Sequence, residues 1–142
     1  MEPIRINERL WVCGQIRPKD VEALAAAGFT ALINNRPDCE DFCQPRARAI
    51  AEAAAQAALS CEHIPVRSQD IAETTIRAFQ RAIAASSGPV LAFCRSGTRS
   101  LTLWAIGEVL NGRLSKAEAT AFGGKLGLDL SGAVAWLNAR GY

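Results

Sequence analysis

The segment that most constrains this chain joins an apolar strand, a glycine-containing loop and a helix around one cysteine. Val90–Phe93 predicts a buried strand, because it is a short apolar run opened by a Gly-Pro turn. A helix is expected to begin near Ser100 and to end near Asn111. The loop between them reads Cys-Arg-Ser-Gly-Thr-Arg over residues 94–99. A strand that enters such a loop and then a helix directs successive backbone N–H groups at one point, which predicts an anion site.

The side chains of this loop suit nucleophilic chemistry on an oxyanion. Cys94 lies where a thiolate would be stabilised, and the thiolate is the form that attacks electrophiles. Arg99 offers a planar group that can bind two oxygens of a phosphate or sulfate. The predicted anion-binding set is Arg95, Ser96, Gly97, Thr98 and Arg99. An inert cysteine in an ordinary polar loop is the alternative, but it would not need two arginines and a glycine at a helix start.

The loop resembles the active sites of two enzyme classes. A strand that ends in cysteine, followed by a glycine-containing loop and Arg-Ser at a helix start, resembles protein-tyrosine and dual-specificity phosphatases. Those families place five residues between cysteine and arginine, whereas four separate Cys94 from Arg99. The shorter spacing resembles rhodanese-type sulfurtransferases, whose cysteine carries a persulfide. The loop alone therefore leaves both chemistries open.

The remainder of the chain is similar to the phosphatases. Leu10–Gln15, the helix near residues 18–27 and the segment Gly28–Arg36 resemble the N-terminal half of small dual-specificity phosphatases, and His63–Val66 resembles the next strand. Residues 4–112 are similar to the bacterial phosphatase-like domain of the β-lactamase hydrolase-like protein family. The resemblance implies a cysteine-phosphatase-like fold, with Cys94 as nucleophile. It also places Ser100 like the family hydroxyl that eases thiolate departure.

A phosphatase also needs an acid that protonates the leaving group. The resemblance points first to Asp70, which follows the strand ending at Val66, although Asp70 and Glu73 also form a capping-box pattern for the next helix. The second group of candidates is Asp38, Glu40 and Asp41, where a solvated turn is the alternative. The sequence leaves the choice of acid open.

Alternating strands and helices predict an α/β fold with a mainly parallel sheet and helices on both faces. The expected strands are Ile4–Ile6, Leu10–Cys13, Thr30–Asn34, Cys61–Val66 and Val90–Phe93. The expected helices are Pro18–Ala27, Pro45–Ala58, Ile71–Ser86, Ser100–Leu110, Lys116–Phe122 and Ser131–Ala139. Proline is expected at the first position of two of them, and Ser115 with Glu118 predicts a capping box. Ligands should bind at the carboxyl ends of the strands, where Cys94 lies.

Bulk properties predict one phosphatase-like domain over residues 1–142. A net charge of +2 gives no reason to expect a nucleic-acid or membrane partner, and the start of the chain lacks a signal peptide, so we expect a cytoplasmic protein. The five cysteines do not predict disulfides there. No metal or cofactor is expected, and His63, in a strand pattern, is expected to be structural.

Three functions remain open. The first is a cysteine-dependent phosphatase that forms a cysteinyl-phosphate on Cys94. The second is a sulfurtransferase that carries sulfane sulfur on Cys94, and the third is a non-catalytic module that binds phosphate or sulfate. The expected partner is accordingly a phosphorylated or sulfane-sulfur substrate, and the oligomeric state is open.

Overall fold

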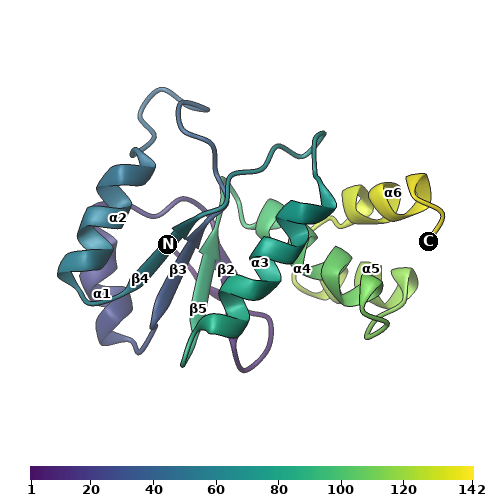
Figure 1. Cartoon of the computed structure of the whole chain (residues 1–142), viewed down its shortest axis with the longest axis horizontal. Coiled ribbons are helices and arrows are strands. Elements are labelled where there is room, and N and C mark those ends of the chain that lie inside the picture. The colour runs from purple at the N-terminus through teal and green to yellow at the C-terminus, as the bar shows by residue number, and fades with distance from the viewer.

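The computed structural model describes residues 1–142 and contains one five-stranded sheet with the strand order β1-β2-β5-β3-β4 (Figure 1). The strands are β1 (Ile4–Arg5), β2 (Leu10–Cys13), β3 (Ala31–Asn34), β4 (Ser60–His63) and β5 (Val90–Phe93). The β2–β5, β5–β3 and β3–β4 pairs are parallel, and only the short edge pair β1–β2 is antiparallel. Every residue of β3 and β5 is buried, as expected for strands covered on both faces.

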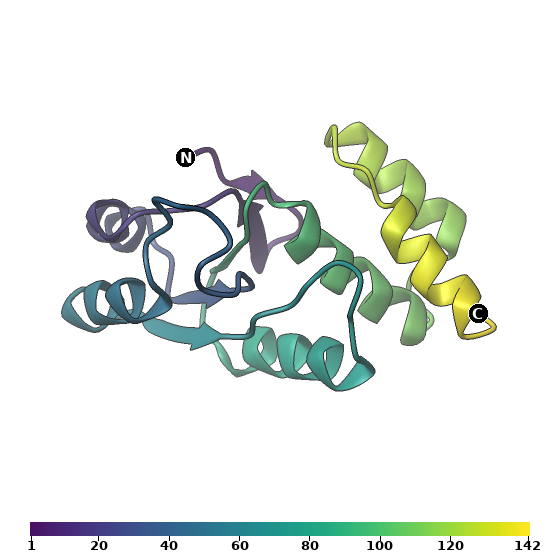
Figure 2. The ribbon, with the colours of Figure 1, turned by 90° about the horizontal axis from the view of Figure 1, so that it is seen from above.

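Helices cover both faces of the sheet. They are the 3-10 helix η1 (Pro18–Asp20) and the α-helices α1 (Val21–Ala26), α2 (Ala47–Gln56), α3 (Glu73–Ala85), α4 (Thr98–Leu110), α5 (Lys116–Lys125) and α6 (Ser131–Ala139). The α1–α2 pair packs on one face and α3–α4 on the other, while α5 and α6 lie beyond α4 (Figure 2). The predicted α/β class with a mainly parallel sheet is therefore confirmed.

Two apolar cores follow from this layering. The smaller one joins α1 and α2 to the sheet through side chains such as Leu24, Ile50 and Phe93. The larger one joins α3, α4 and the C-terminal pair α5–α6 through side chains such as Phe79, Leu103 and Leu137. Helix α4 lies between the sheet and α5–α6, which explains why seven of its 13 residues are buried. No helix of the chain is long and apolar enough to cross a membrane.

The capping predictions had mixed outcomes. Ser115 and Glu118 form the predicted capping box of α5, and Pro18 occupies a first-turn position of η1. Two capping predictions were wrong. Helix α2 begins at Ala47, two residues after Pro45, and its first N–H donates instead to Asp38 at 2.8 Å.

The predicted capping box at Asp70 is also absent, because α3 begins only at Glu73 and its N-cap is Ala72. Asp70 instead closes a turn, in which its N–H donates to the Arg67 carbonyl at 3.0 Å. The next residue, Ile71, is held by α6, since its carbonyl accepts the indole N–H of Trp136 at 2.7 Å. This tertiary contact fixes the segment before α3 in a non-helical conformation.

Candidate active site

Cys94 directly follows β5, the central strand, at the edge where all four parallel strands end. The residues after β2 and β3 reach the same edge, so Gly14 and Asn35 flank the loop from either side. The Gln15 N–H donates to the Arg95 carbonyl at 3.4 Å, and the Asn35 N–H donates to the Phe93 carbonyl at 2.9 Å. Cys94 is 1% exposed, at the base of the loop. The expectation that Cys94 lies at the carboxyl edge of the sheet is confirmed.

Gly97 shapes the loop between Cys94 and α4. Its φ of +95° lies in the left-handed region, which glycine adopts without a steric penalty. The Gly97 N–H donates to the Cys94 Sγ at 3.0 Å, a contact that stabilises a thiolate more than a thiol. A Cβ at this position would lie 3.4 Å from the carbonyl carbon of Cys13, so the loop is also packed closely against β2.

The loop presents backbone donors that nothing in the chain satisfies. Gly97 is the N-cap of α4 and provides no side-chain cap. The N–H groups of Arg95, Ser96, Thr98, Arg99 and Ser100 donate to no backbone or side-chain acceptor. Unpaired N–H groups at a helix start, together with the helix dipole, favour an anion. The predicted anion-binding residues 95–99 are thus brought together as one loop.

The Arg99 guanidinium is oriented by groups from two other segments. Its Nη1 donates to Glu40 Oε2 at 3.0 Å and to the Val66 carbonyl at 2.9 Å, and its side chain is 14% exposed. Nη2 donates to Glu40 Oε1 at 3.3 Å. These contacts hold the guanidinium beside the loop before any ligand arrives.

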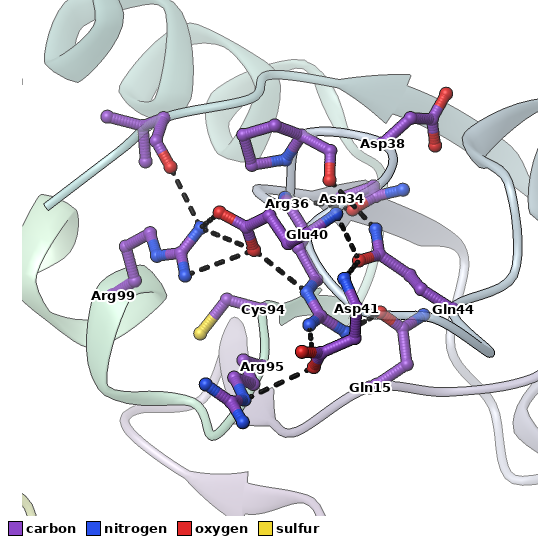
Figure 3. A network of polar contacts seen from close by, with 12 residues as sticks. Gln15, Asn34, Arg36, Asp38, Glu40, Asp41, Gln44, Cys94, Arg95 and Arg99 are labelled. Carbon is purple, nitrogen blue, oxygen red and sulfur yellow. Dashed lines mark hydrogen bonds and ion pairs between the residues drawn. The ribbon is translucent and has the colours of Figure 1, made fainter.

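Arg36, which follows β3, connects the loop to an acidic segment (Figure 3). Its guanidinium donates to Glu40 at 2.9 Å, to Asp41 at 2.5 Å and to the Gln15 side chain at 3.0 Å. Asp41 also pairs with Arg95, at 3.3 Å, so the two carboxylates link Arg36 to both arginines of the loop. In Figure 3 the Cys94 sulfur points away from the Arg36–Asp41 pair.

The ionisation of this network follows from its pairing. Burial disfavours the charged carboxylate of Glu40, but the hydrogen bonds from Arg36 and Arg99 outweigh this and hold the pKa of Glu40 below its ordinary value. Burial likewise disfavours the charge on Arg36, yet its bonds to Glu40 and Asp41 raise the pKa of Arg36. Glu40 is consequently an ionised acceptor and a poor proton donor.

A cavity of about 250 Å³ opens above Cys94. One side is formed by the loop and the start of α4, with the lining residues Cys94, Arg95, Ser96, Thr98, Arg99 and Thr102. The other side comes from the segment before α3 and from the start of α6, with the lining residues Ser68, Ile71, Asp129, Ser131 and Gly132. Asp129 is the single carboxylate among these eleven residues.

The other predicted site residues lie around this cavity without lining it. The Ser100 hydroxyl is buried and donates to Asn35 Oδ1 at 2.7 Å. Asp70 lies between the lining residues Ser68 and Ile71, and its carboxylate makes no hydrogen bond within the chain. Asp38 caps α2. His63 is structural, as predicted, since its Nε2 contacts the Arg36 carbonyl at 2.8 Å.

Sequence reasoning missed four residues of the site. Asn35 directly follows β3, and Gln15 and Arg36 come two residues after β2 and β3. The rule that ligands bind at the carboxyl ends of parallel strands could therefore have found them. Asp129 carries no such signal, because a helical hairpin brings it back to the cavity from beyond α4.

Comparisons with known proteins agree with this geometry. The family model of the β-lactamase hydrolase-like protein, phosphatase-like domain, matches residues 4–111. The β-lactamase hydrolase-like protein of Agrobacterium fabrum is 44% identical over 137 residues, which are 96% of this chain and 32% of that protein. The chain thus spans about a third of the length of the curated relatives it matches.

Solved structures share the fold. A crystal structure from Neisseria meningitidis, with a provisional phosphatase assignment, is 30% identical with a TM-score of 0.84, covering 96% of each chain. TpbA of P. aeruginosa, crystallised with phosphotyrosine, has a TM-score of 0.67 at 18% identity, covering 94% of this chain and 80% of that one. The family match, the fold and the cysteine loop coincide: the chain belongs to the phosphatase-like domain family of the β-lactamase hydrolase-like proteins.

Proposed function

We propose that the chain hydrolyses phosphomonoesters with Cys94 as the nucleophile. The observation that carries the proposal is the set of five unpaired N–H groups in the loop and helix start that follow Cys94, together with the Arg99 guanidinium beside them. Such a ring of donors matches the equatorial oxygens of a phosphoryl group and would stabilise their charge in the transition state. The phosphatase-like family and the shared fold with TpbA, which binds phosphotyrosine, support the same reaction class.

The reaction would take two steps. The Cys94 thiolate attacks phosphorus, an S–P bond forms, and the P–O bond to the alcohol breaks while an acid protonates the leaving oxygen. Water then attacks phosphorus and gives its proton to the carboxylate that the acid became, and the S–P bond breaks, so inorganic phosphate leaves and the thiolate returns. The Gly97 N–H would stabilise the returning thiolate, and Ser100 could assist only if its hydroxyl left Asn35.

Asp70 is our candidate for the proton donor. Among the four carboxylates considered from the sequence, Glu40 and Asp41 are bound to arginines, and Asp38 caps α2. Asp70 is unpaired and lies on the segment that contributes Ser68 and Ile71 to the cavity. Asp70→Asn should remove one ionisation from the pH–rate profile and slow the release of poor leaving groups more than that of p-nitrophenol.

Sulfur transfer remains the second candidate, because the four-residue spacing between Cys94 and Arg99 is that of rhodanese-type loops. The deciding experiment compares wild type and Cys94→Ser with p-nitrophenyl phosphate and with thiosulfate plus cyanide. We expect Cys94-dependent release of phosphate, while Cys61→Ser, on the edge strand β4, serves as the matched control. Cys94-dependent thiocyanate formation without phosphate release would contradict the phosphatase proposal and favour sulfur transfer.

The thiolate itself can be tested by alkylation. Iodoacetate at neutral pH should modify Cys94 faster than the other four cysteines, and phosphate or sulfate should protect it. Cys13 is the internal control: burial, with the neighbouring Cys94 as a smaller cause, raises the pKa of Cys13 to about 12. Peptide mapping gives the rates. Modification of Cys94 no faster than that of Cys61 or Cys13 would contradict a reactive thiolate.

A further inference from the structure

The side of the cavity that lies opposite the Cys94 loop is polar and contains no aromatic ring. We call Asp129, Ser131 and Gly132, at the start of α6, the α6 wall. The only aliphatic side chain in the cavity lining is Ile71, which is itself mostly buried. The cavity volume of 250 Å³ lies below the range of about 300–1,000 Å³ found for drug-sized ligands. An alcohol bound here would be small and would meet hydrogen-bonding groups.

Asp129 gives this wall its charge. Its Oδ1 accepts the Ser131 N–H at 2.9 Å, and this bond holds the pKa of Asp129 below its ordinary value. The Ser131 side chain lowers this pKa further, and Oδ2 accepts no bond from any other residue, so it can accept a hydrogen bond from a ligand. An ionised carboxylate beside an anion site repels further phosphates and favours hydroxyl or ammonium groups on the ligand.

The α6 wall is held in place by contacts between helix α6 and the segment before α3. The Trp136 indole N–H donates to the Ile71 carbonyl at 2.7 Å, and Arg140 stacks over the Trp136 ring at 3.8 Å. Arg140 also donates to the Ile71 carbonyl, at 3.4 Å. Helix α6 and the segment before α3 therefore form one unit, which fixes the geometry of this side of the cavity.

We infer that Asp129 selects the alcohol portion of the substrate, and that the preferred substrates are phosphomonoesters of small polyhydroxylated alcohols. The inference rests on the proposed function, since it assumes that the phosphoryl group sits on the Cys94 loop. A hydroxyl one or two carbons from the ester oxygen donates to Asp129 Oδ2, while the wall contains no aromatic ring on which an aryl group could stack. Asp129 acts as a specificity-determining residue and transfers no proton.

The experiment compares two probes that share a three-carbon chain, glycerol 3-phosphate and n-propyl phosphate. We expect the wild-type kcat/KM for glycerol 3-phosphate to exceed that for n-propyl phosphate about tenfold, because a hydrogen bond to a charged acceptor is strong. In Asp129→Asn the ratio of the two values should fall to near unity. Asp20→Asn is the matched control, because its carboxylate also accepts a backbone N–H, at 2.8 Å from Arg17, but lies outside the cavity.

Three outcomes would overturn the inference. The first is an unchanged substrate ratio in Asp129→Asn, and the second is a loss of kcat on both probes together with one ionisation, which would make Asp129 the proton donor. The third is a higher kcat/KM for a phosphoserine peptide than for glycerol 3-phosphate, which would indicate that the preferred substrates are phosphoproteins. Failure of the proposed function itself looks different, because no probe would then release phosphate in a Cys94-dependent way.

Discussion

Two groups of residues on either side of the Cys94 loop differ in how much of their bonding is already satisfied. On the side of Arg36, the guanidinium is 3% exposed, and the carboxylates of Glu40 and Asp41 bind it and both loop arginines. We call these residues the arginine–carboxylate wall; Arg95 and Arg99 line the cavity, and Arg36, Glu40 and Asp41 lie behind them. On the opposite side, Asp129 makes one internal hydrogen bond and the rest of the α6 wall is small and polar. One wall has its geometry fixed before binding, whereas the other keeps free acceptors for a ligand.

This difference suggests that one wall serves the reaction and the other serves substrate recognition. The chemistry of phosphoryl transfer needs arginine donors that do not reorganise during the reaction, and a bonded network supplies them. Recognition of an alcohol needs groups that are still unsatisfied, because only these gain a hydrogen bond on binding. Changes to the arginine–carboxylate wall should therefore affect all substrates, and changes to the α6 wall should affect them selectively.

The largest expected effect separates the two arginines of the loop. Arg99→Lys should lower kcat/KM for p-nitrophenyl phosphate by about 100-fold or more, because an ammonium cannot make the parallel bonds of a guanidinium. Arg95→Lys should cost only a few-fold, since its side chain is 69% exposed and has a single contact, to Asp41. Arg48→Lys, on the exposed face of α2, is the control. Equal losses at Arg95 and Arg99 would mean that Arg99 is wrongly assigned as the arginine that binds the phosphoryl oxygens.

Removing one charge from the fixed wall should cost stability. Glu40→Gln leaves the buried Arg36 with one carboxylate, so the free energy of unfolding at pH 7 should fall by about 2 kcal/mol. The pKa of Glu40 is lowered by folding, so its stabilisation is complete above the ordinary pKa of about 4.3 and disappears as the pH falls through the lower folded value. Urea unfolding of wild type and variant at several pH values measures this.

The exposed ion pair of α2 provides the control for that experiment. Glu52→Gln removes the partner of Arg48, and both side chains of this pair are largely exposed, so the free energy of unfolding should change by less than about 1 kcal/mol. If the difference between wild type and Glu40→Gln persisted at low pH, the stabilisation would come from packing and not from the charge.

The smallest effects should come from adding one methyl group behind Arg95 of the arginine–carboxylate wall and one on the α6 wall. A Cβ on Gly14 would lie 2.9 Å from the Arg95 carbonyl oxygen, a backbone atom that cannot move cheaply, so Gly14→Ala should destabilise the fold by about 1–2 kcal/mol. A Cβ on Gly132 meets no atom within 4 Å, and alanine is the better helix former. Gly132→Ala should therefore raise stability by about 0.5 kcal/mol, as measured by thermal unfolding. The same sign at both positions would remove the contrast in packing between the walls.

The sequence predicted the parts of the structure that depend on neighbouring residues. The run Val90–Phe93, the loop with Gly97 and the capping box at Ser115 are local patterns, and all three appear in the structure. The strand predicted up to Val66 ends at His63, and the helix predicted from Ser100 begins at Thr98. Such boundaries shift because hydrogen bonds to distant segments compete with local preferences.

The missed features all depend on contacts between distant segments. Asp70 resembled a helix cap, but the indole of Trp136 in α6 holds the carbonyl of the following residue. Glu40 was considered as an acid, and only its contacts with Arg36 and Arg99 identify it as an acceptor. Asp129 reaches the cavity through the packing of α6 against α4, which no local pattern encodes.

The bond from Trp136 to the Ile71 carbonyl has a consequence for protein engineering. Cys94, the loop that follows it and Arg99 lie within the matched residues 4–111, but helix α6 lies outside them. Because α6 is fastened to the segment that carries Asp70, a grafted hairpin that kept Trp136 and Arg140 would preserve the alignment of that segment. The residues of the α6 wall could then be randomised as a cassette, yielding catalysts with new substrate ranges from one unchanged reaction centre.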